Sequence, residues 1–157
     1  KSEIERSAHS KVAVLFIDVD DFKFINDRFG HSVGDEVIKY VAGCIKQRVK
    51  GSGFAGRFGG DEFVLCITDP KQIEEIESLS LDLIDELYEG YHSELANVSI
   101  NVKASIGIAF YPEHGDDSNK VVAAADEAMY FVKKNGKANY HIYQPEDSDM
   151  EDLQHTL

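Results

Sequence analysis

The sequence predicts an α+β sandwich of ferredoxin-like character, in which helices flank a central, mostly antiparallel sheet. Strand-like and helix-like patterns follow one another in the order strand, helix, hairpin, helix, strand, helix, strand. The two strands in the middle are joined by a short turn that contains two glycines, which is typical of an antiparallel hairpin. Because this Gly-rich turn lies inside a hairpin and not between a strand and a helix, it is neither a dinucleotide fingerprint nor a P-loop.

The N-terminal elements follow from their apolar patterns. Residues 12–17 are apolar on both alternating faces, as expected of a strand that is covered on both sides. A short amphipathic helix is predicted over 22–28. Apolar residues then recur at helical spacing over 33–49, with Ser32 as the expected N-cap, and the glycines of 51–53 end this helix.

The rest of the chain alternates in the same way. Asp69-Pro70 opens a second long helix, and Asn135-Gly136 is a C-cap pair that ends a third. An acidic tail or linker is expected over 145–157, after a single domain over 1–144. The two hairpin strands are predicted at 54–58 and 63–67, and the further strands at 98–110 and 140–143. The second and third long helices are predicted at 69–87 and 121–132.

Length, composition and charge exclude several classes of protein. At 157 residues, with 43% hydrophobic and 29% charged residues, the chain has the composition of one folded domain. Its net charge of −13 argues against binding to polymeric nucleic acid and to anionic membrane surfaces, and no apolar stretch is long enough to span a bilayer. A small phosphate ligand would need metal ions and a few local cations. Cys44 and Cys66 fit reduced core thiols, which suits a cytoplasmic protein.

Two acidic clusters are the candidates for chemistry. Asp18 closes the first strand, and Asp61-Glu62 follow the two glycines of the hairpin. If the hairpin pairs beside the first strand, these carboxylates meet at one edge of the sheet, where they would repel unless they shared a cation such as Mg²⁺. The alternative is that Asp18 and Asp20 cap the next helix, and that Gly59-Gly60-Asp61 is ordinary turn chemistry.

Four ordered motifs resemble those of one family. The segment 57–63, Arg-Phe-Gly-Gly-Asp-Glu-Phe, looks like the signature that names the GGDEF family of diguanylate cyclases. Together the motifs run from about Val12 to Tyr143, nearly the whole chain. The other three similar motifs are Asp18 to Asp27 with Gly30-His31 and Gly34-Asp35, then Ser105 to Ala109, then Ala125 to Tyr130 with Lys133 and Gly136-Lys137.

This resemblance implies a palm-type fold related to nucleotide cyclases and polymerases, and the condensation of two GTP into cyclic di-GMP and pyrophosphate by a dimer of half-sites. It also implies two Mg²⁺ or Mn²⁺ ions per half-site. The residues that match metal ligands are Asp18, the carbonyl of Val19, Asp61 and Glu62. Asp61 also matches the group that activates the attacking 3′-hydroxyl, with Glu62 beside it as a catalytic residue. The GTP-binding positions are Asn26 and Asp35 for guanine, His31 and Phe22 in the same pocket, Lys23, Lys133 and Lys137 for the triphosphate, and Arg57 in the signature.

Several of these residues have a structural alternative. Asp35 could be a first-turn acid favoured by the helix dipole, and His31 could serve only to fix its loop. Lys133 lies at a helix end, where cations are favourable in any case. Phe22 could be a plain core residue.

The chain also departs from the family pattern. Lys137 stands where the family usually has Arg, which keeps the charge and loses the bidentate fork. The inhibitory Arg-x-x-Asp motif, which binds product in the family, reads Lys-Gly-Ser-Gly at 50–53. The segment begins after the point where the family's Asp-x-Leu-Thr-Gly-Leu-x-Asn-Arg stretch is expected, so the domain is expected to be truncated at its N-terminus.

The sequence leaves three candidate functions. The leading one is an active cyclase, fused to a sensory or other signalling domain. The second is a GTP-binding regulatory module of the same family that controls a neighbouring domain. The third, an RNA-binding ferredoxin-like sheet, is disfavoured by the net charge and by the lack of an RNP-type aromatic pattern.

Overall fold

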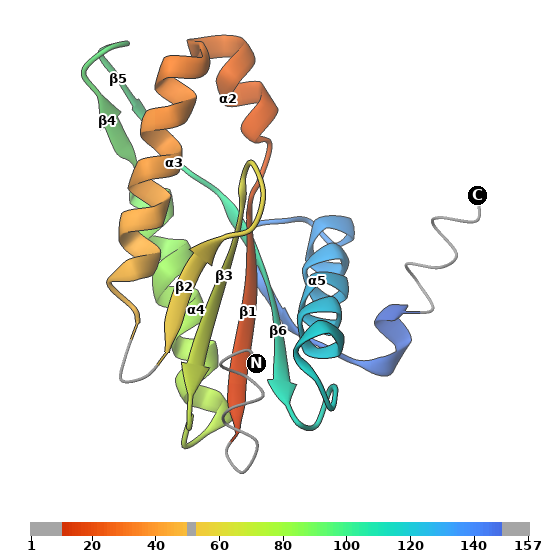
Figure 1. Ribbon diagram of the computed structural model, residues 1–157. Helices are drawn as coiled ribbons and strands as arrows, with labels where there is room; N and C mark the ends of the chain where they lie inside the picture. Colours follow the sequence, from red (N-terminus) through yellow and green to blue (C-terminus); the bar gives the residue numbers. More distant parts are fainter. Residues whose placement is uncertain (1–10, 50–52, 149–157) are drawn as a thin grey trace, which may run out of the picture.

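The computed structural model describes residues 11–49 and 53–148, and its centre is a five-stranded sheet with the strand order β2-β3-β1-β6-β7 (Figure 1). A separate two-stranded sheet is formed by β4 and β5. The elements are β1 (Val12–Val19), α2 (Phe22–Phe29), α3 (His31–Lys46), β2 (Phe54–Arg57), β3 (Glu62–Thr68), α4 (Ile73–Glu89), β4 (Tyr91–Ser93), β5 (Val98–Ile100), β6 (Ala104–Tyr111), α5 (Ser118–Lys134) and β7 (Tyr140–Ile142).

The sheet confirms the predicted fold class. The central strand β1 is antiparallel to both of its neighbours, β3 and β6, and only the last pair, β6 and β7, is parallel. The strands β1, β2, β3 and β6 therefore have the spatial order of a ferredoxin-like sheet, with β7 added at the edge beside β6. The hairpin predicted in the middle of the element order is formed by β2 and β3.

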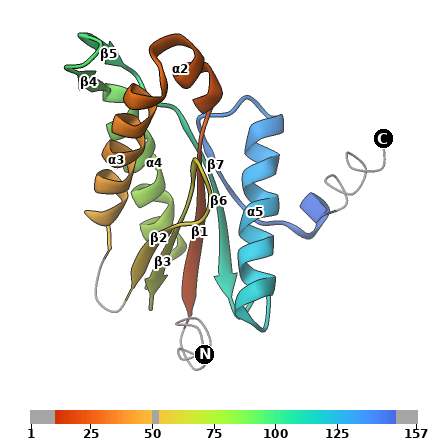
Figure 2. The ribbon, with the colours of Figure 1, turned by 45° about the horizontal axis from the view of Figure 1, so that its top comes forward.

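Helices cover both faces of the sheet, and this explains why β1 is apolar throughout. Leu15 and Ile17 lie in the core that α3 and α4 close, whereas Val14 and Phe16 lie in the core that α5 closes. Alternate residues of a strand point to opposite faces, so a strand between two helical layers has no polar side. Figures 1 and 2 show α3 and α4 on one side of the sheet and α5 on the other.

The packing of α5 on β6 is unusually close at one position. A Cβ atom on Gly107 of β6 would lie 1.9 Å from the carbonyl oxygen of Ala125 and 2.2 Å from the amide nitrogen of Met129. Only a residue without a side chain lets the helix backbone approach the strand so closely. This contact fixes the position of α5 along β6, and the C-terminal end of α5 carries Lys133.

Three local predictions were wrong. The helix α3 begins at His31, one residue before the predicted cap Ser32, and the residue at its N-cap is Gly30. The long strand predicted over 98–110 is two strands, β5 and β6, and β5 pairs with β4, which the sequence did not indicate. The helix predicted to open at Asp69-Pro70 begins at Ile73.

Both cysteines are free and buried, as predicted. None of the helices within 11–49 and 53–148 is both long and apolar enough to cross a lipid bilayer. At the C-terminal end of the described chain, residues 145–148 form a helical turn, and the buried Asp147 accepts a hydrogen bond from the amide of Gln144 at 2.8 Å. Residues 50–52, which belong to the degenerate inhibitory motif, lie outside the described residues.

Candidate functional site

The two acidic clusters meet at one end of the sheet, as the sequence predicted for a hairpin beside the first strand. In the antiparallel register of β1 and β3, Asp18 lies opposite Glu62. The amide of Val19 donates to the carbonyl of Asp61 at 3.1 Å, which extends the pairing beyond the strand. The segments that carry the predicted metal ligands are therefore joined by the backbone itself.

Asp18 is held in an unfavourable electrostatic environment. Its side chain is 15% exposed, and its Oδ1 atom is buried without a hydrogen-bond partner. Burial, together with the neighbouring carboxylate of Asp61, raises the pKa of Asp18 to about 7, although Lys133 acts in the opposite direction. A buried carboxylate oxygen without a donor is a position where a cation would be stabilised.

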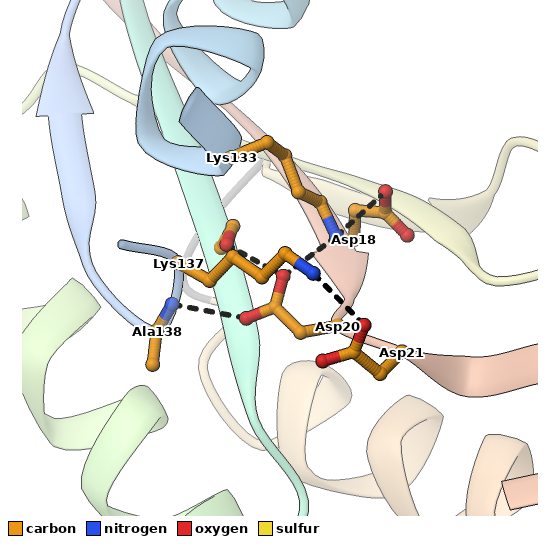
Figure 3. Close-up of polar contacts among 7 residues, drawn as sticks. Asp18, Asp20, Asp21, Lys133, Lys137 and Ala138 are labelled. Carbon is orange, nitrogen blue, oxygen red and sulfur yellow. Dashed lines mark hydrogen bonds and ion pairs between the residues drawn. The ribbon is translucent and has the colours of Figure 1, made fainter. Parts of the chain in front are cut away.

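Lys133, near the C-terminal end of α5, lies between two of these acids (Figure 3). Its Nζ is 3.2 Å from Asp18 and 2.6 Å from Asp20. Burial lowers the pKa of Lys133, but the hydrogen bond to Asp20 and the charges of both carboxylates outweigh burial, so the net pKa is raised. The lysine is thus held as a cation at the edge where the acids gather.

Lys137 reaches the same edge from the loop that follows α5 (Figure 3). Its Nζ donates to Asp21 at 2.8 Å, and this hydrogen bond lowers the pKa of Asp21. Both residues have positive φ angles, 61° for Lys137 and 55° for Asp21. Two of the lysines that match triphosphate ligands therefore lie beside the acidic cluster.

The hairpin turn is shaped by its own side chains. The Nε of Arg57 donates to the carbonyls of Gly59 and Gly60, both at 3.1 Å, so the arginine predicted to bind substrate holds the turn in this structure. A Cβ on Gly59 would lie 2.9 Å from Oε1 of Glu62, whereas a Cβ on Gly60 would meet nothing within 4 Å. Burial raises the pKa of Glu62, and the charges of Asp126 and Asp61 add to this effect.

The residues that match the guanine pocket lie on α2 and the first turns of α3, at the same end of the sheet as the hairpin turn (Figure 1). A Cβ on Gly34 would lie 1.8 Å from Oδ1 of Asn26 and 3.2 Å from Cζ of Phe22. The bare glycine thus makes room for the side chain of Asn26. Phe22 is half-buried against the core, in line with the structural alternative for that residue.

Three further residues of the predicted GTP site are exposed. Lys23, His31 and Asp35 all face solvent, which leaves them accessible to a ligand. The alternative role of Asp35 as a first-turn acid is wrong, because α3 begins at His31 and no acid lies in its first turn.

The acidic edge fits a magnesium ion that substrate phosphates would help to bind. Within the described ranges, no group of three or more His, Cys, Asp or Glu side chains is arranged to hold a metal ion without other ligands. Mg²⁺ is commonly held by one or two carboxylates together with waters and substrate phosphates, not by a closed protein cage. The unsatisfied oxygen of Asp18, beside Asp61, would contribute protein ligands to such a site. Asp18 and Asp20 do not cap the next helix, since the residue at the N-cap of α2 is Asp21.

Sequence reasoning missed the importance of Asp20, which it considered only as a helix cap. The whole residue is 3% exposed, yet its carboxylate is bonded to groups from three other segments. The available signal was its position one residue past a fully apolar strand, followed far along the chain by a lysine at a helix end. Neither feature reveals that these two side chains meet.

Comparison with known proteins assigns the family. The model of the family described as "Diguanylate cyclase, GGDEF domain" matches residues 1–139. This chain belongs to the GGDEF domain family. The solved structure of a delta-N mutant of TpbB from Pseudomonas aeruginosa, which comprises only the GGDEF domain, agrees with this assignment: it superposes with a TM-score of 0.89 at 30% identity, over 96% of this chain and 89% of that one.

The curated relatives differ in their named activities. Diguanylate cyclase DosC from Escherichia coli is 34% identical over 134 residues, which is 85% of this GGDEF domain. Cyclic di-GMP phosphodiesterase PdeR from the same organism is 32% identical over 143 residues, or 91% of it. The chain spans only 28% and 21% of the lengths of these two relatives. The comparison therefore places the domain among proteins of cyclic di-GMP signalling.

Proposed function

We propose that this GGDEF domain condenses two GTP molecules into cyclic di-GMP, with release of two pyrophosphates. The observation that carries the proposal is the meeting of Asp18, Asp61 and Glu62 at one end of the sheet, with Lys133 beside them. The set combines hard oxygen ligands with a cation, which nucleotidyl transfer requires at the reacting phosphate. Every position matched to metal or guanine in the family is occupied here by the family's residue.

The chemistry is a pair of substitutions at phosphorus. The 3′-oxygen of one GTP attacks the α-phosphorus of the other, and the bond from that phosphorus to the pyrophosphate oxygen breaks. The same substitution in the opposite direction closes the ring and releases the second pyrophosphate. In our proposal Asp61 accepts the proton of the 3′-hydroxyl, and Lys133 and Lys137 offset the negative charge of the leaving pyrophosphate. Asp18, Asp61, Glu62 and the carbonyl of Val19 would hold Mg²⁺ or Mn²⁺, which supplies charge neutralisation at both the attacking and the leaving oxygen.

The choice of guanine follows from hydrogen-bond chemistry. Guanine presents an N1–H and an amino group side by side as donors, and the exposed carboxylate of Asp35 can accept both. Adenine lacks the donor at N1 and cannot match this pattern. Asn26, whose side chain packs over Gly34, supplies the second contact to the base in this proposal.

The product also defines the assembly. Each chain would hold one GTP, so two chains must face each other for the two nucleotides to react. The open space around Gly60 in the hairpin turn is consistent with close approach of phosphates to the backbone there. We further propose that the domain is fused to a sensory or other signalling domain, because its relatives are several times longer than this chain.

A second candidate is a GTP-binding regulatory module that controls a neighbouring domain without turnover. The similarity to PdeR, a protein named as a phosphodiesterase, favours it. The intact hairpin acids favour turnover. Incubation of the purified domain with GTP and Mg²⁺ separates the two functions, because only the cyclase produces cyclic di-GMP and pyrophosphate.

The test of the catalytic assignment is Asp61→Asn. This change keeps size and removes charge, and we expect turnover to fall by about two to three orders of magnitude while the melting temperature barely changes. Asp82→Asn on the exposed surface of α4 is the matched control and keeps parental activity. An Asp61→Asn variant with near-parental turnover would remove this hairpin from the active site.

A further inference from the structure

Asp20 is the most deeply buried acid at this end of the sheet. The side chain of Asp20 has no exposed surface, and both of its oxygens are engaged (Figure 3). Its Oδ1 accepts from Nζ of Lys133 at 2.6 Å and from the hydroxyl of Ser105 at 2.7 Å. Its Oδ2 accepts from the amide of Ala138 at 3.0 Å.

These three donors come from three separate segments. Lys133 belongs to α5, Ser105 to β6, and Ala138 to the loop between α5 and β7. A buried carboxylate is stable only when its charge is paired and its lone pairs are satisfied, so the three segments are drawn to one point at the end of β1.

The contacts of Asp20 act on both lysines of the proposed triphosphate site. Lys133 has two carboxylate partners, so its ion pair with Asp20 would remain when a ligand binds Asp18. Lys137 and Ala138 have φ angles of 61° and 50°, a left-handed pair that is costly for residues with a side chain. The hydrogen bond from the amide of Ala138 to Asp20 fixes this turn, and thereby the backbone from which Lys137 extends.

We propose that Asp20 is a positioning residue for the triphosphate: it orients Lys133 directly and Lys137 through the turn at Ala138. The inference rests on the proposed function, since it concerns how this site binds GTP. It predicts that Asp20 affects recognition of the phosphates and leaves recognition of guanine unchanged, because Asn26 and Asp35 lie on α2 and α3.

Asp20→Asn is the informative substitution. An amide has one accepting oxygen where the carboxylate has two, and its nitrogen only donates. In one orientation the amide nitrogen faces the amide of Ala138, and in the other it faces Lys133 and Ser105. Either way a donor is left facing a donor, and the charge that holds Lys133 is gone.

Asp147→Asn is the matched control. Asp147 is buried to the same degree, 4% exposed against 3% for Asp20. It accepts a backbone amide, that of Gln144, and pairs with Nε2 of His141 at 3.1 Å, but it lies in the C-terminal turn with no contact to either lysine. The two variants therefore remove comparable buried acceptors, one inside and one outside the proposed site.

The experiment measures two affinities for each protein in Mg²⁺: for guanosine 5′-(α,β-methylene)triphosphate, whose α–β bridge cannot be cleaved, by calorimetry, and for guanosine by NMR titration. In Asp20→Asn we expect triphosphate affinity to fall at least about tenfold, the factor of one lost charge-assisted hydrogen bond. Guanosine affinity stays at the parental value, and Asp147→Asn leaves both affinities unchanged.

The outcomes separate the two proposals. Parental protein that binds the triphosphate, with Asp20→Asn unchanged or with both ligands weakened equally, overturns the positioning role alone. Parental protein that binds neither ligand overturns the proposed function and this inference with it. If Asp20→Asn does not fold, Ser105→Ala decides: it removes one donor to Asp20 and must lower triphosphate affinity without changing guanosine affinity.

Discussion

Gly34→Ala tests the guanine site with a single methyl group. Gly34 is buried in the second turn of α3, against the side chain of Asn26. The added Cβ would lie 1.8 Å from Oδ1 of Asn26, and ordinary contact begins at 3.4 Å, so the amide must move by about 1.6 Å. Phe22, whose Cζ is 3.2 Å from the same Cβ, limits the direction of this movement.

The expected loss follows from this displacement. Misplacement of a positioning group by about 1 Å costs on the order of 100-fold in enzymes, and we expect kcat/KM for GTP to fall by about that factor. A 100-fold loss corresponds to about 2.7 kcal/mol of transition-state stabilisation. Affinity for guanosine falls in parallel, because the damaged contact is to the base.

Gly43→Ala is the internal control on the same helix. A Cβ at Gly43 meets nothing within 4 Å, and the residue is exposed. Replacing this helical glycine by alanine stabilises the fold by about 1 kcal/mol and leaves kinetics unchanged. The assay is the initial rate of pyrophosphate release over a range of GTP concentrations, with urea unfolding for stability. Parental kcat/KM in Gly34→Ala, or an equal loss in both variants, would refute the assignment of Asn26.

Three further outcomes are expected. Gly107→Ala, whose Cβ would overlap the backbone oxygen of Ala125, should lower the free energy of unfolding by about 3 kcal/mol, as urea titration will show. Burial lowers the pKa of His114, whose Nδ1 accepts from the amide of Phe110. Because the folded protein resists protonation of this ring, its contribution to the free energy of unfolding is fully present above pH 6.5 and is lost as the pH falls further. His114→Gln should flatten this dependence in unfolding curves at about pH 5 to 8. Finally, micromolar cyclic di-GMP should not inhibit the domain through residues 50–53, because a lysine and a glycine replace the expected arginine fork and carboxylate; submicromolar binding lost in Lys50→Ala would contradict this.

Sequence patterns were sufficient where a single periodicity decided the structure. The two-sided apolar pattern of 12–17 predicted a central strand, and the turn at Gly59-Gly60 predicted the hairpin that brings the acids together. They failed where a tertiary contact interrupts the pattern. The strand predicted over 98–110 is interrupted because the amide of Val102 donates to the carbonyl of Leu87 and not to a neighbouring strand. The alternation of apolar and polar residues cannot reveal this hydrogen bond.

The same distinction applies to the site. The family motif located each acid and each lysine in the sequence, but the charge of a residue does not say which partner it finds in the fold. Ser32 has a side chain that is typical of a helix cap. The cap position of α3 is nevertheless taken by Gly30, whose φ is 92°, and Ser32 lies inside the helix. The alternative in which Asp20 caps the next helix follows the same logic and is wrong, because Asp20 is buried against Lys133.

The pairing of the lysines also explains how a chain of net charge −13 could bind a triphosphate. Lys133 and Lys137 are not held ready as free positive charges, because each is already bonded to an aspartate. A triphosphate that arrived alone would meet lysines whose charge is largely offset, next to Asp18 and Asp61. A divalent cation at the unsatisfied Oδ1 of Asp18 would offset that repulsion and would leave the contact of Lys133 to Oδ2 in place beside the phosphates. Nucleotide and metal should therefore bind with positive coupling, each increasing the affinity of the site for the other.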